Sequence, residues 1–342
     1  MHLSSLAQAE ALASAKLSPP DARAAEDARR HSAALVKPEG ALGRLEHLAV
    51  WLAAWHGDPR PRVGSPVVLV FAASHGVARH GVSAYPPEVT RQMIRVFEDG
   101  GAAVNQLARL CGAEVRIAPL TPDIPCADIS EGPALSEREF LQAFSYGMNS
   151  VSECRGCDLL ILGEMGIGNT TAAAALCLAL FGGKPEDWTG PGTGLDREGV
   201  LRKRRIVAAA RDANSGFLDA SPLARLQAFG GLEISAIAGA VLEARRRRLP
   251  VLLDGFACTA AAAVLAVSAP GALDHCVVGH LSAEPGHALL LKKIAKSPLL
   301  RLNMRLGEAS GAAVAFHVLR SALACHNDML KMDAAGVSQR KP

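Results

Sequence analysis

The chain has 342 residues, of which 49% are hydrophobic and 20% charged, a composition that allows a large core and excludes a disordered or collagen-like chain. Lys and Arg (36) exceed Asp and Glu (33) by only three, and aromatic residues make up 4%, which does not favour nucleic-acid binding. We therefore expect a small-molecule partner and no nucleic acid. At about 150 residues per domain, the length fits two or three domains, or one large α/β domain with an appendage.

Neither a leader nor a membrane span is expected. Residues 1–17 lack a basic start and carry Glu10 within their apolar part, unlike a secretory signal. Residues 255–273 are uncharged and long enough to cross a bilayer, but they contain Pro270 and follow Asp254 directly. Their Ala, Gly, Ser and Thr content is typical of a helix packed behind a buried strand. The sequence therefore predicts a cytoplasmic protein without a membrane-spanning segment.

Short apolar runs alternate with helical patterns along the chain. Strands are expected at Val67–Ala72, Ala113–Pro119, Asp158–Leu162, Pro250–Asp254 and His275–His280. Helices are expected over Pro87–Arg109 (broken at Gly100–Gly101), Thr170–Phe181 and Leu232–Arg248. This alternation predicts an α/β fold with a doubly wound, mostly parallel sheet. Residues 1–60 and about 312–342 contain helical patterns only, so we expect them to form a small helical domain beside a large domain of about residues 61–311.

Small and polar residues directly follow four of these strands. The four motifs are Ser74-His75-Gly76, Gly163–Thr171, Asp254-Gly255-Phe256 and His280–Glu284. In an open parallel sheet, ligands bind outside the carboxyl ends of the strands. The four motifs therefore predict a single site at one edge of the sheet.

The segment Gly163–Thr171 is the strongest local signal for a ligand. Its glycines, Gly163, Gly166 and Gly168, permit close backbone approach, and Asn169-Thr170-Thr171 opens an Ala-rich helix whose amides suit a phosphate. No Lys precedes Thr170, so this is not a nucleotide-triphosphate loop of the Walker type. The alternative is a tight turn between a strand and a capped helix.

A second glycine-rich turn, residues 190–194, precedes a helix with four consecutive cations. These are Arg202, Lys203, Arg204 and Arg205. One of them could reach the same phosphate as a point charge, although a run of charges is more often a solvated helix face.

Three other patterns are interpreted as structural. Arg245–Arg248 closes a helix and is expected to be a solvated cap that complements the helix dipole. Cys154 and Cys157 have no second pair of ligands, so we expect two thiols rather than a zinc or redox site. His275, His280 and His287 have no metal-binding spacing, and no metal is expected.

Glu308 is a lone carboxylate directly before the uncharged run 309–316. Partial desolvation would raise its pKa toward the range in which it accepts a proton near neutral pH. The alternative is a glutamate that caps the start of a helix.

Together these motifs resemble those of the nicotinate-nucleotide–dimethylbenzimidazole phosphoribosyltransferase family, over about Lys37–Ser338. The matching segments are Lys37–Glu46, His75–Val77, Gly81–Pro86, Glu88–Thr90, Gly163–Thr171, Gly192–Asp196, Gly230–Ile234, Leu253–Phe256, Ser282–Gly286 and Arg305–Gly311. The family builds the lower nucleotide loop of cobalamin. The resemblance implies a Rossmann-like large domain, a small helical domain from the two termini, and a homodimer.

The implied reaction moves the phosphoribosyl group of nicotinate mononucleotide to 5,6-dimethylbenzimidazole, with inversion at the anomeric carbon and without a metal or cofactor. The resemblance implies that Glu308 is the catalytic base, and Glu164 is expected to stabilise the ribosyl centre. Phosphate and ribose contacts are implied for Gly166, Gly168, Asn169, Thr170, Lys203 and Ser282, and base contacts for Ser74, His75, Tyr85 and Met93.

Two residues depart from the family pattern. Ser74 stands where the family usually has Asp or Asn, and Ala309 follows Glu308 where the family usually has Gly. These departures keep open a transfer to another lower-ligand base, such as adenine or a phenol. A non-catalytic protein that binds the base or its riboside is the alternative outside enzymes, but it would not need both Glu164 and Glu308.

Overall fold

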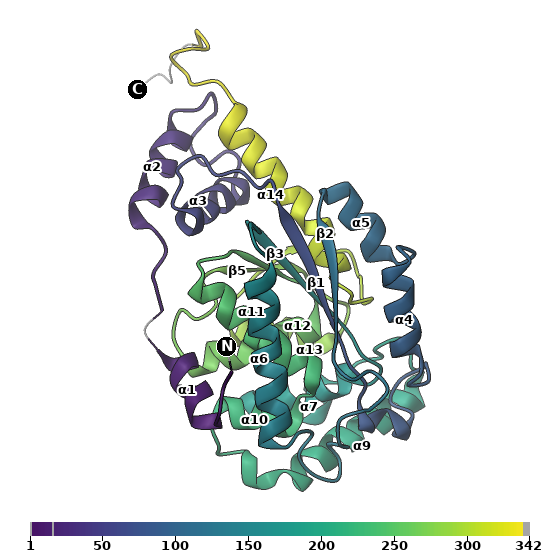
Figure 1. Cartoon of the computed structure of the whole chain (residues 1–342). Helices are drawn as coiled ribbons and strands as arrows, with labels where there is room; N and C mark the ends of the chain where they lie inside the picture. Colours follow the sequence, from purple (N-terminus) through teal and green to yellow (C-terminus); the bar gives the residue numbers. More distant parts are fainter. Residues whose placement is uncertain (1, 16, 338–342) are drawn as a thin grey trace.

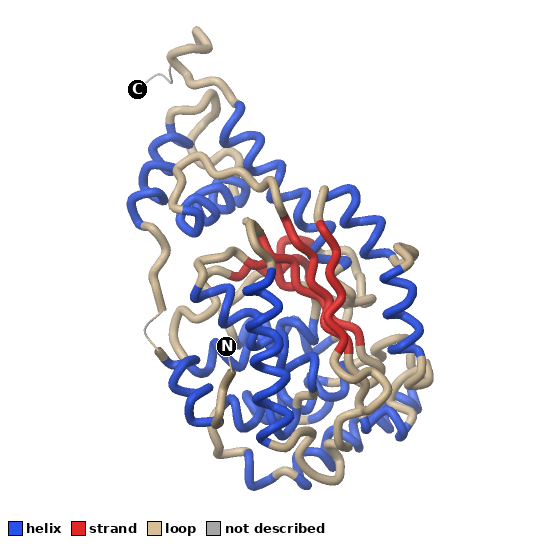
Figure 2. Tube along the Cα trace, viewed as in Figure 1, coloured by secondary structure: helices blue, strands red, loops and turns tan. Residues whose placement is uncertain are grey.

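The computed structural model describes residues 2–15 and 17–337, and it contains one six-stranded sheet (Figures 1 and 2). The strands are β1 (Pro66–Ala72), β2 (Glu114–Pro119), β3 (Leu159–Met165), β4 (Val251–Leu253), β5 (Cys276–His280) and β6 (Pro298–Leu300). Their order is β2-β1-β3-β4-β5-β6, and all neighbouring strands are parallel. The predicted α/β fold is confirmed. The sequence predicted five of the strands but not β6, whose three residues are only partly buried.

Helices cover both faces of the sheet, which is why its strands are apolar on both sides. Val67, Leu69 and Phe71 of β1 belong to one buried core, whereas Val68 and Val70 belong to a second core on the opposite face. The first core includes residues of α6 (Glu137–Glu153), α7 (Asn169–Phe181), α10 (Pro222–Phe229), α11 (Leu232–Arg246) and α12 (Phe256–Ser268). The second includes residues of α3 (Arg44–His56), α5 (Ala103–Cys111) and α14 (Ser310–Asp328).

The other helices are spread along the chain. They are α1 (Leu6–Ser14), α2 (Ala22–Ala33), α4 (Val89–Glu98), α8 (Pro185–Trp188), α9 (Arg197–Ala213) and α13 (Pro285–Lys293), with two short 3₁₀ turns, η1 (Gly76–His80) and η2 (Ser215–Phe217). Most of the uncharged stretch 255–273 forms α12, and all but the end of this helix is buried. No helix within residues 2–15 and 17–337 combines the length and the hydrophobicity that crossing a membrane requires.

The helices from the two ends of the chain do not form a single group. Figure 1 shows α2 and α3 beside α14 at one end of the protein, whereas α1 lies at the other end. There α1 contacts α6, α10 and α12. The sequence grouped α1 with α2 and α3, and the structure separates them. Because α3 and α14 share a buried core with the sheet, the proposed boundary between two domains stays a prediction.

The arginines at the end of α11 differ in their surroundings. Arg246 and Arg247 are exposed and pair with Glu243, as expected for a solvated cap. Arg245 is buried, and its guanidinium lies 4.4 Å from the ring centre of Trp55. The prediction of a solvated cap is therefore wrong for Arg245, because this side chain faces α3 and stacks on an aromatic ring.

Candidate active site

The carboxyl ends of β1 and β3 form the centre of the candidate site. In the sheet, β1 lies between β2 and β3. The connections on the two sides of β1 therefore run in opposite directions, and a ligand crevice is expected at such a switch point. Ser74 and His75 follow β1 after one residue, and Glu164 lies at the end of β3. The structure thus places two of the four polar motifs on neighbouring strands.

Glu164 and Glu308 are joined through their backbones. The amide of Glu308 donates a hydrogen bond of 3.0 Å to the carbonyl oxygen of Glu164. The Glu164 side chain is buried and accepts a hydrogen bond from the Asn169 side chain at the start of α7. The segment before α14 and the end of β3 are therefore held together, with one carboxylate on each.

The absence of a side chain at Gly163 allows this contact. A Cβ added there would overlap the amide nitrogen of Ala309 and lie 2.6 Å from the carbonyl carbon of Glu308. Residues 307–309 also have positive φ angles of 82°, 64° and 67°, a conformation that costs energy for Glu308 and Ala309. The backbone strain is thus located at the residue expected to act as the base.

Several carboxylates share the same buried region and affect one another. Burial and the nearby Asp254 carboxylate raise the pKa of Glu308 to about 7. Burial, Asp254 and Glu233 raise the pKa of Glu164 well above its usual value, against the effect of Asn169. A glutamate with a pKa near 7 can accept a proton at neutral pH and release it again.

Asp254, which the sequence marked only as part of a motif, links β4 to α14. One of its carboxylate oxygens accepts a hydrogen bond of 2.9 Å from the amide of Ala312 and lies 3.4 Å from Nε2 of His280. The other oxygen is buried without a partner among the described residues. Asp254 thereby fixes the first turn of α14, and with it the nearby Glu308, which lies just before this helix.

A buried lysine lies beside the start of α7. Nζ of Lys203, on α9, donates hydrogen bonds to Oγ1 of Thr170 at 2.8 Å and to the carbonyl oxygen of Gly190 at 3.3 Å. Burial lowers the pKa of Lys203 to about 8, although Glu284 opposes this effect. The expectation of a cation near the predicted phosphate loop therefore corresponds to Lys203, and not to its more exposed neighbours on the same helix.

The turn 190–194 connects the remaining parts of this region. The amide of Gly192 donates to Oε1 of Glu284 at 2.7 Å, and its carbonyl oxygen accepts from Arg305 at 2.8 Å. Thr193 contacts the loop before α4 through Ser83, at 3.1 Å between the hydroxyl oxygens. Ser282 is buried, and its hydroxyl accepts from the amide of Glu284. The sequence reasoning gave no role to Glu284 or Arg305, although both lie in matching motifs.

Ser74 and His75, just after β1, each have a partner outside the pair of carboxylates formed by Glu164 and Glu308. Ser74 is buried and donates a hydrogen bond of 2.6 Å to the carbonyl oxygen of Pro122. His75 is also buried, and both ring nitrogens have partners: Nε2 lies 2.5 Å from Oε1 of Glu233, and Nδ1 lies 3.8 Å from Sγ of Cys126. Their expected contact with the base stays a prediction, since each side chain already has a structural partner.

The other residues expected at the base are on and before α4. Tyr85 is 54% exposed, and Met93 packs partly buried against the core that contains Ala309. The hydroxyl of Thr90 accepts a hydrogen bond of 3.1 Å from the amide of Ile167, which ties α4 to the loop after β3. The start of α4 is therefore fixed next to the Glu164 loop.

Metal binding has no support in this region. Among residues 2–15 and 17–337, no three His, Cys, Asp or Glu side chains are arranged to hold a metal ion. Cys154 and Cys157 are free thiols, and burial raises the pKa of Cys157 to about 12. His287 uses its two ring nitrogens for the amide of Ser282 and the hydroxyl of Thr259.

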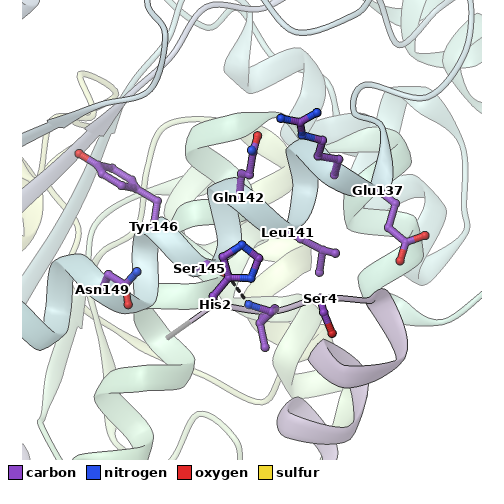
Figure 3. A pocket seen from close by; sticks show the side chains of 10 residues that line it. His2, Ser4, Glu137, Leu141, Gln142, Ser145, Tyr146 and Asn149 are labelled. Carbon is purple, nitrogen blue, oxygen red and sulfur yellow. Dashed lines mark hydrogen bonds between the residues drawn. The ribbon is translucent and has the colours of Figure 1, made fainter.

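The structure also has a large hollow away from these residues, between the N-terminal segment and α6. Figure 3 shows His2 and Ser4 facing Leu141 and Ser145, with Tyr146 and Asn149 farther along the helix. Its volume is about 1060 Å³, and the amide of Leu3 donates to the hydroxyl of Ser145. None of the candidate catalytic residues lines it, so we do not assign it to the site.

Known proteins resemble the chain over nearly all of its length. The model of a family described as phosphoribosyltransferase matches residues 17–337. Nicotinate-nucleotide–dimethylbenzimidazole phosphoribosyltransferase from Jannaschia sp. (strain CCS1) is 52% identical, with 93% of this chain and 94% of that protein covered. The protein of the same name from Agrobacterium fabrum is 50% identical, with 94% and 92% covered. A crystal structure of this enzyme from Thermus thermophilus superposes with a TM-score of 0.86 at 41% identity and covers 94% of this chain and 100% of that one.

Proposed function

Because the chain belongs to the nicotinate-nucleotide–dimethylbenzimidazole phosphoribosyltransferase family, we propose that it moves the phosphoribosyl group of nicotinate mononucleotide to 5,6-dimethylbenzimidazole. The products are nicotinate and α-ribazole 5′-phosphate, with inversion at the anomeric carbon. The observation that carries this proposal is the placement of Glu308, a buried carboxylate with a pKa near 7 beside Glu164.

The chemistry needs one proton acceptor. A benzimidazole has one nitrogen with a lone pair and one N–H group, so attack on C1′ of the ribose leaves a cation unless the N–H proton is removed. Glu308 is the group proposed to remove it. Nicotinate leaves as a neutral pyridine nitrogen and needs no general acid.

Glu164 has a separate role in the proposal. The ribose gains oxocarbenium character as the bond to nicotinate breaks, and a nearby carboxylate stabilises that positive charge. Only the ionised form can do so, whereas burial and the neighbouring acids favour the protonated form. The positive charge on nicotinate mononucleotide itself, at the pyridinium nitrogen, would favour ionisation of Glu164 when the substrate binds.

The phosphate is proposed to bind between the start of α7 and Lys203. Gly166, Gly168, Asn169 and Thr170 supply backbone and polar side-chain groups at a helix start, and Lys203 supplies the positive charge. Ser282 is proposed to contact the phosphoribosyl group from the end of β5. The hydroxyl of Thr170 already binds the Lys203 ammonium, so one anion could contact both.

We further propose that the protein works as a cytoplasmic homodimer, as expected from the family resemblance. Light scattering coupled to size-exclusion chromatography measures the mass in solution directly. A monomer at the concentration used for the assay would contradict this part of the proposal and leave the transfer reaction untouched.

A product assay tests the function. Nicotinate mononucleotide is incubated with 5,6-dimethylbenzimidazole, adenine or a phenol, and the nucleotide product is identified by mass spectrometry. The proposal expects α-ribazole 5′-phosphate with 5,6-dimethylbenzimidazole. If product forms with adenine or a phenol but not with 5,6-dimethylbenzimidazole, the protein transfers the group to another lower-ligand base. If the base binds but no product forms, the protein is a binding protein.

A further inference from the structure

Cys126 lies beside His75, and the proposed transfer gives this cysteine no role. The two residues form an isolated parallel β-bridge after the ends of β1 and β2. The amide of Cys126 donates a hydrogen bond of 3.1 Å to the carbonyl oxygen of Ser74. The amide of Gly76 donates one of 3.0 Å to the carbonyl oxygen of Cys126. These two hydrogen bonds fix the backbone that carries the thiol.

The side chains form a Cys–His–Glu array. Sγ of Cys126 lies 3.8 Å from Nδ1 of His75, and Nε2 of the same ring lies 2.5 Å from Oε1 of Glu233, on α11. Burial alone would lower the pKa of His75, but Glu233 and Cys126 raise it well above its usual value. A neutral histidine that a carboxylate orients can accept the thiol proton, and the imidazolium formed in this way stabilises the thiolate, which is the nucleophilic form of cysteine.

Cys111, Cys157 and Cys276 do not share this arrangement. Sγ of Cys111 lies 3.8 Å from Nε2 of His317, but the thiol donates to the carbonyl oxygen of Ala313, and burial raises its pKa to about 11. Burial raises the pKa of Cys157 to about 12. Cys276 also lies near a histidine, His275, but burial and Arg245 lower the pKa of that histidine to about 3. His275 therefore remains neutral and cannot stabilise a thiolate.

The Cys126 cavity, which Cys126, His75, Pro122 and Pro125 help to line, has a volume of about 660 Å³. The charged residues around it are four carboxylates and two guanidiniums, namely Glu88, Asp123, Asp128, Glu131, Arg79 and Arg91. Both guanidiniums pair with carboxylates. An excess of negative charge favours a small neutral reagent over an anion.

We propose that Cys126 is a redox-sensitive thiol that reacts with small neutral hydroperoxides. The thiolate sulfur attacks one oxygen of the peroxide, an S–O bond forms and the O–O bond breaks. Sulfur is oxidised to sulfenic acid, the peroxide is reduced, and the leaving hydroxide or alkoxide takes the proton from His75. The products are Cys126 sulfenic acid and water or an alcohol.

His75 connects this thiol to the proposed phosphate loop, and this second step rests on the proposed function. A Cβ added to Gly166 would lie 3.3 Å from Nε2 of His75, and one added to Gly168 would lie 3.2 Å from its Cβ. The ring is therefore packed against the loop. Oxidation replaces the negative sulfur by a neutral sulfenic acid, leaves the His75 ring without its extra proton, and adds an oxygen atom beside the ring. The loop is expected to shift, and the KM for nicotinate mononucleotide to rise.

The first experiment measures the thiol without reference to activity. Wild-type protein is labelled with iodoacetamide at about pH 6.5, and peptide mass spectrometry follows Cys126 and the more exposed Cys325. Cys126 is expected to react roughly tenfold faster, since His75 lies within reach of its thiol proton and the sulfur lines the cavity. With iodoacetate, which is an anion, Cys126 should no longer be labelled faster than Cys325.

Glu233→Gln tests the array itself. This change keeps the size of the side chain but removes the charge that holds the imidazolium, so the labelling rate of Cys126 should shift toward higher pH. The labelling of Cys325 in the same sample serves as the internal control. Equal rates for the two cysteines in wild-type protein, or coincident pH profiles for Cys126 in wild-type and Glu233→Gln proteins, would overturn the proposal.

The second experiment uses hydrogen peroxide followed by dimedone, which traps sulfenic acid. The adduct is expected on Cys126, with a higher KM for nicotinate mononucleotide in wild-type and Cys325→Ser proteins but not in Cys126→Ser or Cys126→Ala. Trapped sulfenic acid with an unchanged KM would refute the connection to the loop. No adduct at Cys126 would refute the redox site, even if the transfer activity is as proposed.

Discussion

The amide of Glu308 donates its hydrogen bond to the carbonyl oxygen of Glu164, so the backbone and not only two flexible side chains sets the spacing of these carboxylates. One residue is at the end of β3 and the other lies just before α14, 144 positions later in the chain. Any change that separates these two segments should therefore affect the reaction more than it affects the binding of either substrate.

Glu308→Gln is expected to lower kcat by about 10²–10⁴-fold with a much smaller change in KM, because the amide keeps the shape of the side chain but cannot accept the proton. Steady-state kinetics with 5,6-dimethylbenzimidazole measure this effect. An N-substituted benzimidazole has no proton to lose and should restore part of the activity, if it binds. The exposed Glu98→Gln is the matched control, and near-normal turnover by Glu308→Gln would place the base elsewhere.

The pKa of Glu308 near 7 predicts opposite effects of pH on activity and stability. The kcat should rise as the pH passes through about 7, because the base must be ionised. The free energy of unfolding should fall over about pH 4.5–7, because the folded state holds the proton more tightly than the unfolded state. Glu308→Gln should remove both trends. Chemical denaturation and kinetics over the same pH series measure them, and parallel profiles in the two proteins would contradict the assignment.

Gly163→Ala is expected to displace the segment that carries Glu308. The added methyl group would meet the backbone of Glu308 at 2.6 Å and that of Ala309 more closely still, which the surroundings cannot relieve by moving a side chain alone. We expect a loss of about 1–3 kcal/mol in the free energy of unfolding, together with a reduced kcat. Gly132→Ala is the control, since a Cβ there meets nothing within 4 Å. A variant with normal kcat would show that the close contact is not needed for catalysis.

Lys203→Met is expected to weaken the binding of nicotinate mononucleotide without destabilising the fold. Burial lowers the pKa of Lys203 to about 8, so the charged form is less favourable in the folded protein than in water. In the wild-type protein, the KM should rise as the pH increases beyond about 8, and stability should increase between about pH 8 and 10.5. The exposed Lys292→Met is the control. An unchanged KM in Lys203→Met would exclude the lysine from the phosphate site.

Ser74→Ala tests whether this position selects the base. Its hydroxyl donates to the carbonyl oxygen of Pro122, and the loss of that buried hydrogen bond should lower the free energy of unfolding by about 1 kcal/mol. Because Ser74 is expected to contact the base, the ratio of kcat/KM values for 5,6-dimethylbenzimidazole and adenine should also change. An unchanged ratio would contradict direct contact between residue 74 and the base.

The sequence predicted the elements of the fold better than their arrangement. Buried strands such as β1 and β3 are continuous apolar runs, whereas β6 is short and half-buried and has no such signature. Helix α6 was not predicted, although Ser136 and Glu139 form a capping box at its start, a signal that the sequence does contain. The strand order could not be predicted, because it depends on which faces the crossover helices cover.

For the candidate site, too, the sequence predicted the residues better than the contacts between them. Glu164, Glu308 and the phosphate loop lie in motifs that the sequence displays, but their mutual contact depends on Gly163, whose role becomes visible only when β3 and residues 307–309 are brought together. The burial of Lys203 among more exposed cations is likewise a property of the packing between α7 and α9. Local sequence cannot distinguish one cation of a run from the next when their chemistry is alike.

The packing of α3 against α14 has a consequence for the synthesis of the protein. A ribosome synthesises α3 (Arg44–His56) well before its partner α14, which is complete only at Asp328. Until then Leu48 and Leu52 lack the apolar surface that α14 provides, and Glu308, encoded just ahead of that helix, has no fixed position. Between the synthesis of α3 and that of α14, the nascent chain is therefore catalytically incomplete and exposes apolar surface, which makes it a client for chaperones.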